Sequence, residues 1–146
     1  MLKLIAAAAL LGATPAAAEV VTKPSPHTVD VTADRLAAAA GDAGATVVAR
    51  VDHAAAAEGA GMVIPGATLL IFGDPQVGTP VMQEDLRAGL VLPLRVLVHE
   101  ADGSASAVTY QTASDLFAGL DVDPSGEAAA RIDGALDNLT NSAVAD

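Results

Sequence analysis

The chain of 146 residues contains no cysteine and no tryptophan, and aromatic side chains make up only 2% of it. Without cysteine the protein cannot form disulfides, thiolate zinc sites, cysteine-ligated iron–sulfur clusters or covalent haem attachments, and it cannot use thiol catalysis. With one tyrosine and two phenylalanines, a binding site built from stacked aromatic rings is not expected. The core must therefore come from the small aliphatic residues that dominate the hydrophobic 52% of the sequence.

Basic residues are also scarce, with 7 lysines and arginines against 18 aspartates and glutamates and a formal net charge of −11. Proteins that bind nucleic acid or anionic lipid usually present a basic patch that displaces counterions. The composition therefore excludes nucleic acid as a partner. The acidic surface either faces a basic partner or keeps the protein soluble.

The first eighteen residues, MLKLIAAAALLGATPAAA, have the layout of a secretory signal peptide. A single lysine precedes an apolar run, and small residues at Ala16 and Ala18 form an A-x-A cleavage site. The run is shorter than the stable anchor of about 20 residues that crosses a bilayer. We expect cleavage after Ala18 and a periplasmic or secreted protein, with an uncleaved anchor as the alternative. Cleavage leaves 6 basic and 18 acidic residues, hence a net charge of −12.

Helices and strands alternate along the rest of the chain, after a short extended segment at residues 19–24. A helix is expected after Thr28 as N-cap, because apolar residues then recur at helical spacing. Its predicted apolar stripe is Val29, Ala33, Leu36 and Ala40. Residues 45–52 read as a strand, and an alanine-rich helix follows with Asp52 as a suitable N-cap. Residues 67–72, ATLLIF, lack polar alternation and predict a central strand covered on both faces.

The second half of the chain predicts a hairpin and two further helices. Residues 92–100 alternate as a strand, and Asp102-Gly103 forms a turn into an antiparallel partner. A short helix follows, then a longer one with Asp123 as N-cap, Pro124 at its first position and an apolar stripe at Ile132, Leu136 and Leu139. The last six residues are expected to fray. The pattern predicts a single α+β domain with a mixed or antiparallel sheet of about four to five strands and helices packed on it.

Three stretches resemble the domain of unknown function 302 family. They are TVDVTADRLAAAAGDAGATVVARVDHAAAAEGAG, ATLLIFGDPQVGTPVMQ and AGLVLPLRVLVHEADGSASAVTY, and they cover about residues 25–118. The resemblance implies a compact α+β domain that can pair as a homodimer, with no established reaction, and residues 119–146 would form a C-terminal helical extension. The chain departs from the family at His99, where tryptophan is frequent, and at Tyr110-Gln111-Thr112.

Two groups of residues are candidates for a ligand site. Arg50 and Asp52 share a strand face and precede His53, whose unperturbed pKa of about 6.5 suits proton transfer or metal binding. A structural interpretation is favoured for Arg50 and Asp52, with Asp52 capping the alanine-rich helix and Arg50 neutralising it. Thr79 and Pro80 are the second group, because they predict a helix start.

A helix N-terminus attracts anions, and Gly78 before it and Met82 behind it complete the second group. For the loop itself, a rigid connection that only shapes the fold is the favoured interpretation. We expect a cleft between Arg50-Asp52-His53 and Gly78-Thr79-Pro80, with Met82 as an apolar wall. The favoured function is a non-catalytic module that binds a small ligand or a protein, without a cofactor.

Two other functions remain open. Imidazole and thioether ligands suit copper or zinc, so His53, His99 and Met82, with Met62 as a further candidate, would form a metal site. A hydrolase or isomerase would use His53 as general base with Asp52 or Asp74 nearby. The spatial arrangement of His53, His99 and Met82 distinguishes these alternatives.

Overall fold

The computed structural model describes residues 20–103 and 105–146. The predicted signal peptide lies outside the described residues, so its cleavage stays a prediction. No helix within the described ranges has the length and apolar character needed to cross a membrane. In chain order the elements are β1 (Val20–Ser25), α1 (Val29–Asp42), β2 (Thr46–Asp52), α2 (His53–Gly59), β3 (Ala67–Gly73), α3 (Pro75–Glu84), the 3-10 helix η1 (Leu86–Leu90), β4 (Leu94–Glu100), β5 (Ser106–Gln111), α4 (Ala113–Leu116) and α5 (Glu127–Val144).

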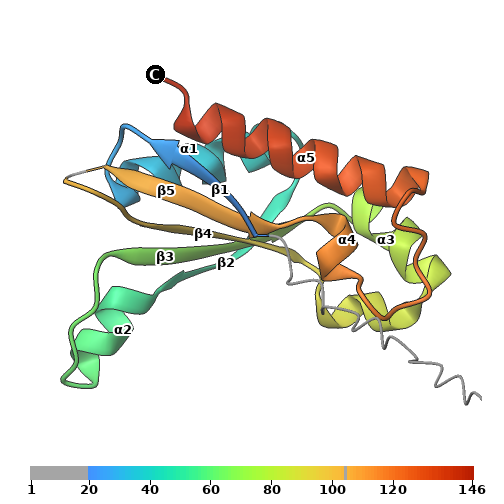
Figure 1. Ribbon diagram of the computed structural model, residues 1–146, viewed down its shortest axis with the longest axis horizontal. Coiled ribbons are helices and arrows are strands. Elements are labelled where there is room, and N and C mark those ends of the chain that lie inside the picture. Colours follow the sequence, from blue (N-terminus) through green and yellow to red (C-terminus); the bar gives the residue numbers. More distant parts are fainter. Residues whose placement is uncertain (1–19, 104) are drawn as a thin grey trace, which may run out of the picture.

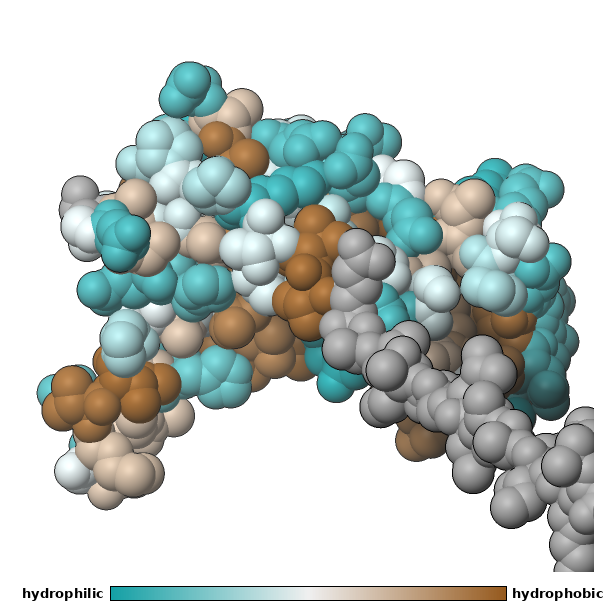
Figure 2. All heavy atoms as spheres, viewed as in Figure 1, coloured by the Kyte–Doolittle hydropathy of each residue, from teal (hydrophilic) through white to brown (hydrophobic). Residues whose placement is uncertain are grey.

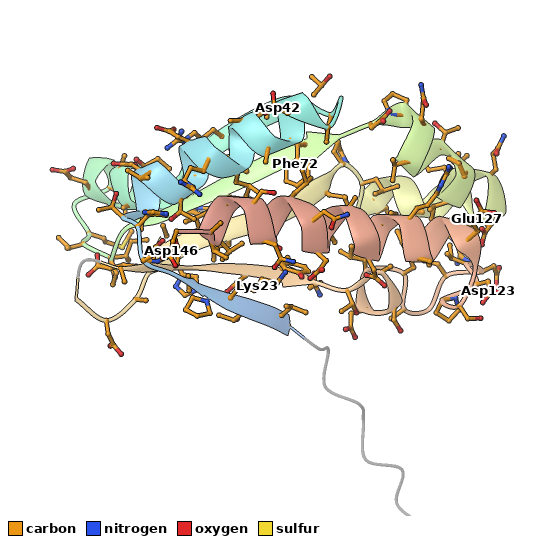
Figure 3. All side chains as sticks on the ribbon, turned by 90° about the horizontal axis from the view of Figure 1, so that it is seen from above. Lys23, Asp42, Phe72, Asp123, Glu127 and Asp146 are labelled. Atoms are coloured by element: carbon orange, nitrogen blue, oxygen red, sulfur yellow. The ribbon has the colours of Figure 1, made fainter. Side chains whose placement is uncertain are left out.

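The five strands form one antiparallel sheet in the order β1-β5-β4-β3-β2. The long helices α1 and α5 lie side by side on one face of it (Figure 1 and Figure 3). The predicted single α+β domain is confirmed. The sequence left a mixed and an antiparallel sheet open, and the sheet is antiparallel. The hairpin between β4 and β5 turns at Gly103, whose φ of +74° is the left-handed conformation that glycine adopts readily.

β3 is a central strand, but helices cover only one of its faces. Thr68, Leu70 and Phe72 are buried, whereas the residues between them are half-buried. The prediction of two covered faces was wrong, because α1 and α5 pack on the same side of the sheet. An unbroken apolar strand therefore does not by itself distinguish a strand with two covered faces from one with a single covered face.

Local capping chemistry places α1 as predicted. The hydroxyl of Thr28 accepts the N–H of Val31, and Ala33, Leu36 and Ala40 are fully buried in the core. Val29, the fourth residue of the predicted stripe, is partly buried against the same core, so the helix start and its buried face are both confirmed.

α5 carries its predicted stripe but begins later than expected. Ile132, Leu136 and Leu139 are buried, whereas the helix starts at Glu127 with Gly126 as N-cap. Asp123 instead closes a turn ahead of the helix, because its carboxylate accepts the N–H of Ser125 at 2.9 Å. The predicted cap at Asp123 was therefore wrong.

Two basic side chains form hydrogen bonds that link α5 to β1 and α1. The ammonium of Lys23 on β1 donates to Asp137 Oδ1 at 2.6 Å, and this contact lowers the pKa of the Asp137 carboxyl. Arg35 on α1 donates to the carbonyl oxygens of Ala143 and Ala145 at 3.0 and 2.8 Å. The predicted fraying of the last six residues was wrong, since α5 continues to Val144.

Candidate functional site

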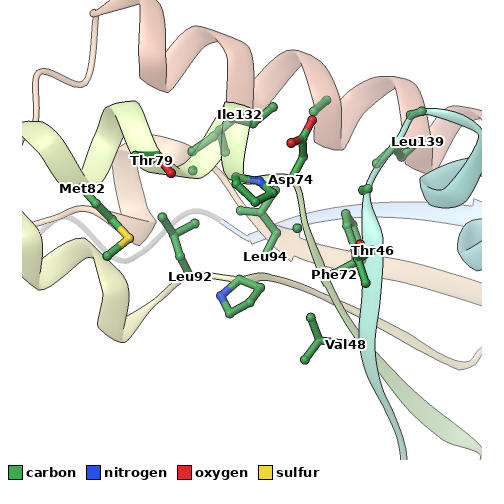
Figure 4. Close-up of a pocket in the computed structure, with 18 of the residues that line it drawn as sticks. Thr46, Val48, Phe72, Asp74, Thr79, Met82, Leu92, Leu94, Ile132 and Leu139 are labelled. Carbon is green, nitrogen blue, oxygen red and sulfur yellow. The ribbon is translucent and has the colours of Figure 1, made fainter.

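A pocket of about 600 Å³ lies at the end of the sheet where β2 begins and β3 ends (Figure 4). Its walls come from the α1–β2 junction, the end of β3, α3, the segment between η1 and β4, and α5. The lining residues are Ala43, Ala45, Thr46, Val48, Phe72, Gly73, Asp74, Pro75, Val77, Gly78, Thr79, Met82, Gly89, Leu92, Pro93, Leu94, Ile132, Ala135, Asn138 and Leu139. A volume of this size accommodates a small organic molecule.

Small residues create this space. Gly73 sits against Pro93, where an added Cβ would come within 3.2 Å of the proline Cβ, and a Cβ at Gly89 would come within 3.1 Å of Met82 Cε. A Cβ at Gly78 would instead make ordinary contact, 3.5 Å from Leu92 Cδ1. The first two glycines permit close packing of the walls, and the third leaves free volume.

Few polar side chains face the pocket. The lining includes the carboxylate of Asp74, the amide of Asn138 and the hydroxyls of Thr46 and Thr79. One oxygen of the Asp74 carboxylate already has a partner in its own helix, because Oδ1 accepts the N–H of Gln76 at 2.8 Å. Such a lining favours an apolar ligand and leaves a few groups to orient a polar end.

The helix that forms one wall starts earlier than the sequence predicted. α3 begins at Pro75 with Asp74 as N-cap, which places Pro80 inside the helix. The prediction of a helix start at Thr79-Pro80 was wrong, because Asp74-Pro75 offers the same kind of cap and first-turn proline five residues earlier, directly after β3. Thr79 therefore lies within the helix, and the anion-binding helix end expected there is not formed.

The other predicted group, Arg50, Asp52 and His53, does not line the pocket. The guanidinium of Arg50 pairs with Asp34 and approaches Asp30 at 3.6 Å, both on α1. The expected pairing of Arg50 with Asp52 was therefore wrong, although the two share a face of β2.

The structural interpretation holds for Asp52, which caps α2 by accepting the N–H of Ala55 at 2.9 Å. His53 begins α2, at the opposite end of β2 from the pocket residue Thr46. Asp74 follows the pocket end of β3, so it is not the partner that a general base at His53 would need. Of the seven residues proposed for the cleft, Gly78, Thr79 and Met82 line the pocket, while Pro80 borders a separate shallow groove with Glu84 and Arg131.

The residues considered for a metal site lie apart. Met82 lines the pocket, whereas His99 on β4 contacts Thr109 Oγ1 and the carbonyl of Glu100, each at 3.0 Å. Among the described residues, no group of three or more histidine, aspartate or glutamate side chains is positioned to hold a metal ion. The binding of copper or zinc by His53 and His99 stays a hypothesis, and the described residues include no cluster of ligands to which both histidines belong.

Sequence reasoning missed most of the pocket walls. Phe72 and Ile132 were assigned to a strand and a helix stripe, but nothing local indicates that they meet around one space. The repeated small residues at positions 43, 45, 73, 78, 89 and 135 are the one signal in the sequence. They become informative only once the fold brings them together.

An ion pair outside the pocket holds η1 in place. The carboxylate of Asp85 accepts Nε and Nη2 of Arg87 at 3.0 and 2.6 Å and the N–H of Asp121 at 2.9 Å. These contacts, led by the hydrogen bond from the Arg87 side chain, hold the pKa of Asp85 well below its usual range. η1 is followed by the pocket residues Leu92 and Pro93, so this pair supports one wall.

We expect the Asp85→Asn variant to be less stable than wild type at pH 7, with the difference narrowing below about pH 4. The folded-state pKa of Asp85 is lowered, so the carboxylate stabilises the fold above the unfolded pKa of about 3.9 and this contribution fades as the pH falls. Urea unfolding at pH 7 and pH 3 measures the effect. The Asp42→Asn variant, at an exposed position, controls for the loss of one negative charge. A stability difference that persists unchanged at pH 3 would contradict the assignment.

Comparison with known proteins assigns the fold. A family model described as Domain of unknown function DUF302 matches residues 21–139. A crystal structure of an uncharacterized conserved DUF302 protein from Bacillus stearothermophilus superposes with a TM-score of 0.76 at 20% sequence identity, covering 85% of this chain and 97% of that one. At this identity the likeness shows the fold alone.

Part of the chain is also similar to larger proteins. It is 49% identical over 84 residues to the fluoride-specific ion channel FluC 1 of Brucella suis, a stretch that is 58% of this chain and 33% of that protein. FluC 2 of Brucella melitensis matches at the same identity over 31% of its length. The aligned stretch is thus about a third of these relatives, whereas the family model spans most of the present chain, which belongs to the DUF302 family.

Proposed function

We propose that this protein is an exported binding module that holds a small apolar molecule in the pocket between β2, α3 and α5, without catalysing a reaction. The observation that carries the proposal is the cavity of about 600 Å³ lined mainly by apolar side chains. Ligand sites typically have this character, with a few polar groups that fix orientation. The signal-like first eighteen residues support export, and an N-terminal sequence beginning at Glu19 in the purified protein would test it.

Charge narrows the class of ligand. A chain with a formal net charge of −11 repels anions on approach, and the carboxyl group that lines the pocket belongs to Asp74. We therefore propose a neutral or cationic apolar ligand rather than a fatty acid. The same chemistry argues against fluoride as the ligand, because a small anion needs N–H donors or cations around it.

The Gly78→Leu variant is expected to weaken binding of a neutral naphthylamine dye about tenfold or more. A Cβ at this position makes only ordinary contact with Leu92, so the larger side chain fills the pocket without forcing its walls apart. The stability of the variant should not fall, because glycine inside a helix is unfavourable by about 0.5–1 kcal/mol relative to alanine. Dye fluorescence titration and a thermal melt measure the two effects.

Gly134 offers a matched control for this variant. It also lies within a helix, is exposed, has no heavy atom within 4 Å of an added Cβ and is outside the pocket. Gly134→Leu should bind the dye as wild type does. Equal binding by both variants, or no binding by wild type, would overturn the proposed site.

A further inference from the structure

The sheet has one face under α1 and α5 and a second face, here called the open face, on which the other side chains of the strands lie (Figure 1). On β3 and β4 the register sets Leu69 opposite Leu97 and Ile71 opposite Arg95. Val51 of β2 lies opposite Leu69. Side chains opposite or diagonal to one another on the same face are in contact distance. The side chains of Val51, Leu69, Ile71 and Leu97 therefore form one continuous apolar strip, half-buried or exposed.

The open face becomes polar on the side of β5 and β1. Thr109 of β5 lies opposite Leu97, and Thr22 of β1 lies opposite Thr109. The two threonine hydroxyl oxygens are 3.0 Å apart, and His99 Nε2 is 3.0 Å from Thr109 Oγ1. The open face thus has an apolar half and a polar half, and β4 runs between them.

No strand contributes a negative charge to the open face. The five strands contain two acidic residues, Asp52 and Glu100. Their register partners, Thr68 and Ser106, are buried on the side of the helices, so Asp52 and Glu100 lie on that side as well. A chain with 18 acidic residues therefore presents a face whose strands carry no carboxylate.

Arg95 gives this face a positive charge that nothing in the domain neutralises. The other basic side chains of the described residues each contact a carboxylate or carbonyl oxygen; they are Lys23, Arg35, Arg50, Arg87 and Arg131. The side chain of Arg95 is exposed on the middle strand of the sheet and has no ion pair or hydrogen bond to any described residue. A guanidinium matches a carboxylate through two parallel N–H donors, so Arg95 is suited to a carboxylate that another molecule supplies.

We propose that the open face binds an acidic amphipathic helix of another protein. The helix lies along β3 and β4, with its apolar side on the strip and a carboxylate paired with Arg95. Adjacent strands are about 5 Å apart and a helix with its side chains is about 10 Å wide, so one helix covers the strip and reaches Arg95. The docked helix completes a third layer, in the way that helices cover both faces of many sheets.

This surface is distinct from the ligand pocket. None of Leu69, Ile71, Arg95 and Leu97 lines the pocket, so the two binding functions stand or fall separately. The proposal also opposes what the net charge of −11 predicts, since a strongly acidic protein repels an acidic partner. At about 0.15 M salt that repulsion is screened beyond roughly 8 Å, and the guanidinium at the contact determines which partner is preferred.

Two synthetic peptides test the preference. Each has about 18 residues, enough to form a helix on the sheet, with leucines along one side and either glutamates or glutamines along one flank. Glutamate and glutamine have similar helix propensities, so the peptides differ in charge. The protein contains no tryptophan, so a single tryptophan in each peptide reports binding by its fluorescence. The glutamate peptide should bind about tenfold more tightly than the glutamine peptide.

Arg95→Gln should weaken binding of the glutamate peptide about tenfold and leave binding of the glutamine peptide unchanged, because the variant removes the carboxylate partner alone. Arg131→Gln is the matched control, since Arg131 is exposed on α5 and its loss changes the net charge equally. Arg131→Gln should keep the preference of the wild type. Gly78→Leu should bind both peptides as wild type does, because it alters the pocket.

The apolar strip has its own variant. Leu97→Thr should weaken binding of both peptides about tenfold, and threonine is well tolerated in strands. Val31→Thr, at an exposed position of α1, should change neither affinity. The proposal is overturned if the wild type binds neither peptide, if it prefers the glutamine peptide, or if Arg95→Gln and Leu97→Thr both bind as wild type does. A dimer in sedimentation equilibrium that Leu97→Thr converts to a monomer also overturns it, because a second copy of the chain then covers the open face.

Discussion

Replacing Phe72 by alanine is expected to lower the free energy of unfolding by about 4 kcal/mol and to weaken dye binding. The ring is 1% exposed and stands between the core and the pocket (Figure 4). Its removal forfeits the burial of a large side chain and leaves a cavity that the neighbouring strands cannot close. Urea unfolding measures the first effect and fluorescence titration the second.

Phe117, the other phenylalanine of the chain, provides the matched control. It is 3% exposed in the same core but does not line the pocket. Phe117→Ala should therefore cost a comparable free energy of unfolding and leave dye affinity unchanged. A cost below about 1 kcal/mol for Phe72→Ala would contradict its place in the core, and equal dye affinity in the two variants would show that Phe72 is not a wall of a binding site.

The contrast between these two residues illustrates what the sequence could and could not predict. Periodicity identifies the buried faces of α1 and α5, because hydrophobic burial acts on each helix separately. The walls of the pocket come from segments that are distant in the sequence, so Phe72 and Ile132 carry no local sign that they face one space. The sequence thus predicts which side chains are buried, but not which of the buried side chains surround a cavity.

Helix starts show a different limit, because two equally good local signals can compete. Asp74-Pro75 and Thr79-Pro80 both offer a capping side chain before a proline. The earlier signal prevails because β3 ends at Gly73 and the chain turns there at once. A cap therefore predicts that a helix begins nearby, and the fold selects which cap is used.

At the end of the sheet opposite the pocket, a buried chain of hydroxyl groups bears on the register of β1. Thr32 Oγ1 on α1 lies 2.8 Å from Ser25 Oγ on β1 and 2.9 Å from Ser106 Oγ on β5. All three side chains are buried, and Ser25 and Ser106 are also paired in the sheet. A one-residue slip of β1 would move Ser25 away from Thr32 while Ser106 kept its contact, so the buried hydroxyl of Ser25 favours the observed register of the edge strand.

We expect Thr32→Val to lower the free energy of unfolding by about 2 kcal/mol. Valine preserves the shape of threonine but provides neither donor nor acceptor, so the hydroxyls of Ser25 and Ser106 lose a buried hydrogen-bond partner. Chemical denaturation of the single variant measures this cost. The same substitution in a Ser25→Ala, Ser106→Ala background should cost much less, because no polar group then remains to be left unpaired. An equal cost in both backgrounds would mean that the hydrogen bonds to Ser25 and Ser106 do not account for the loss, and that the strand register is set by the hydrophobic pattern alone.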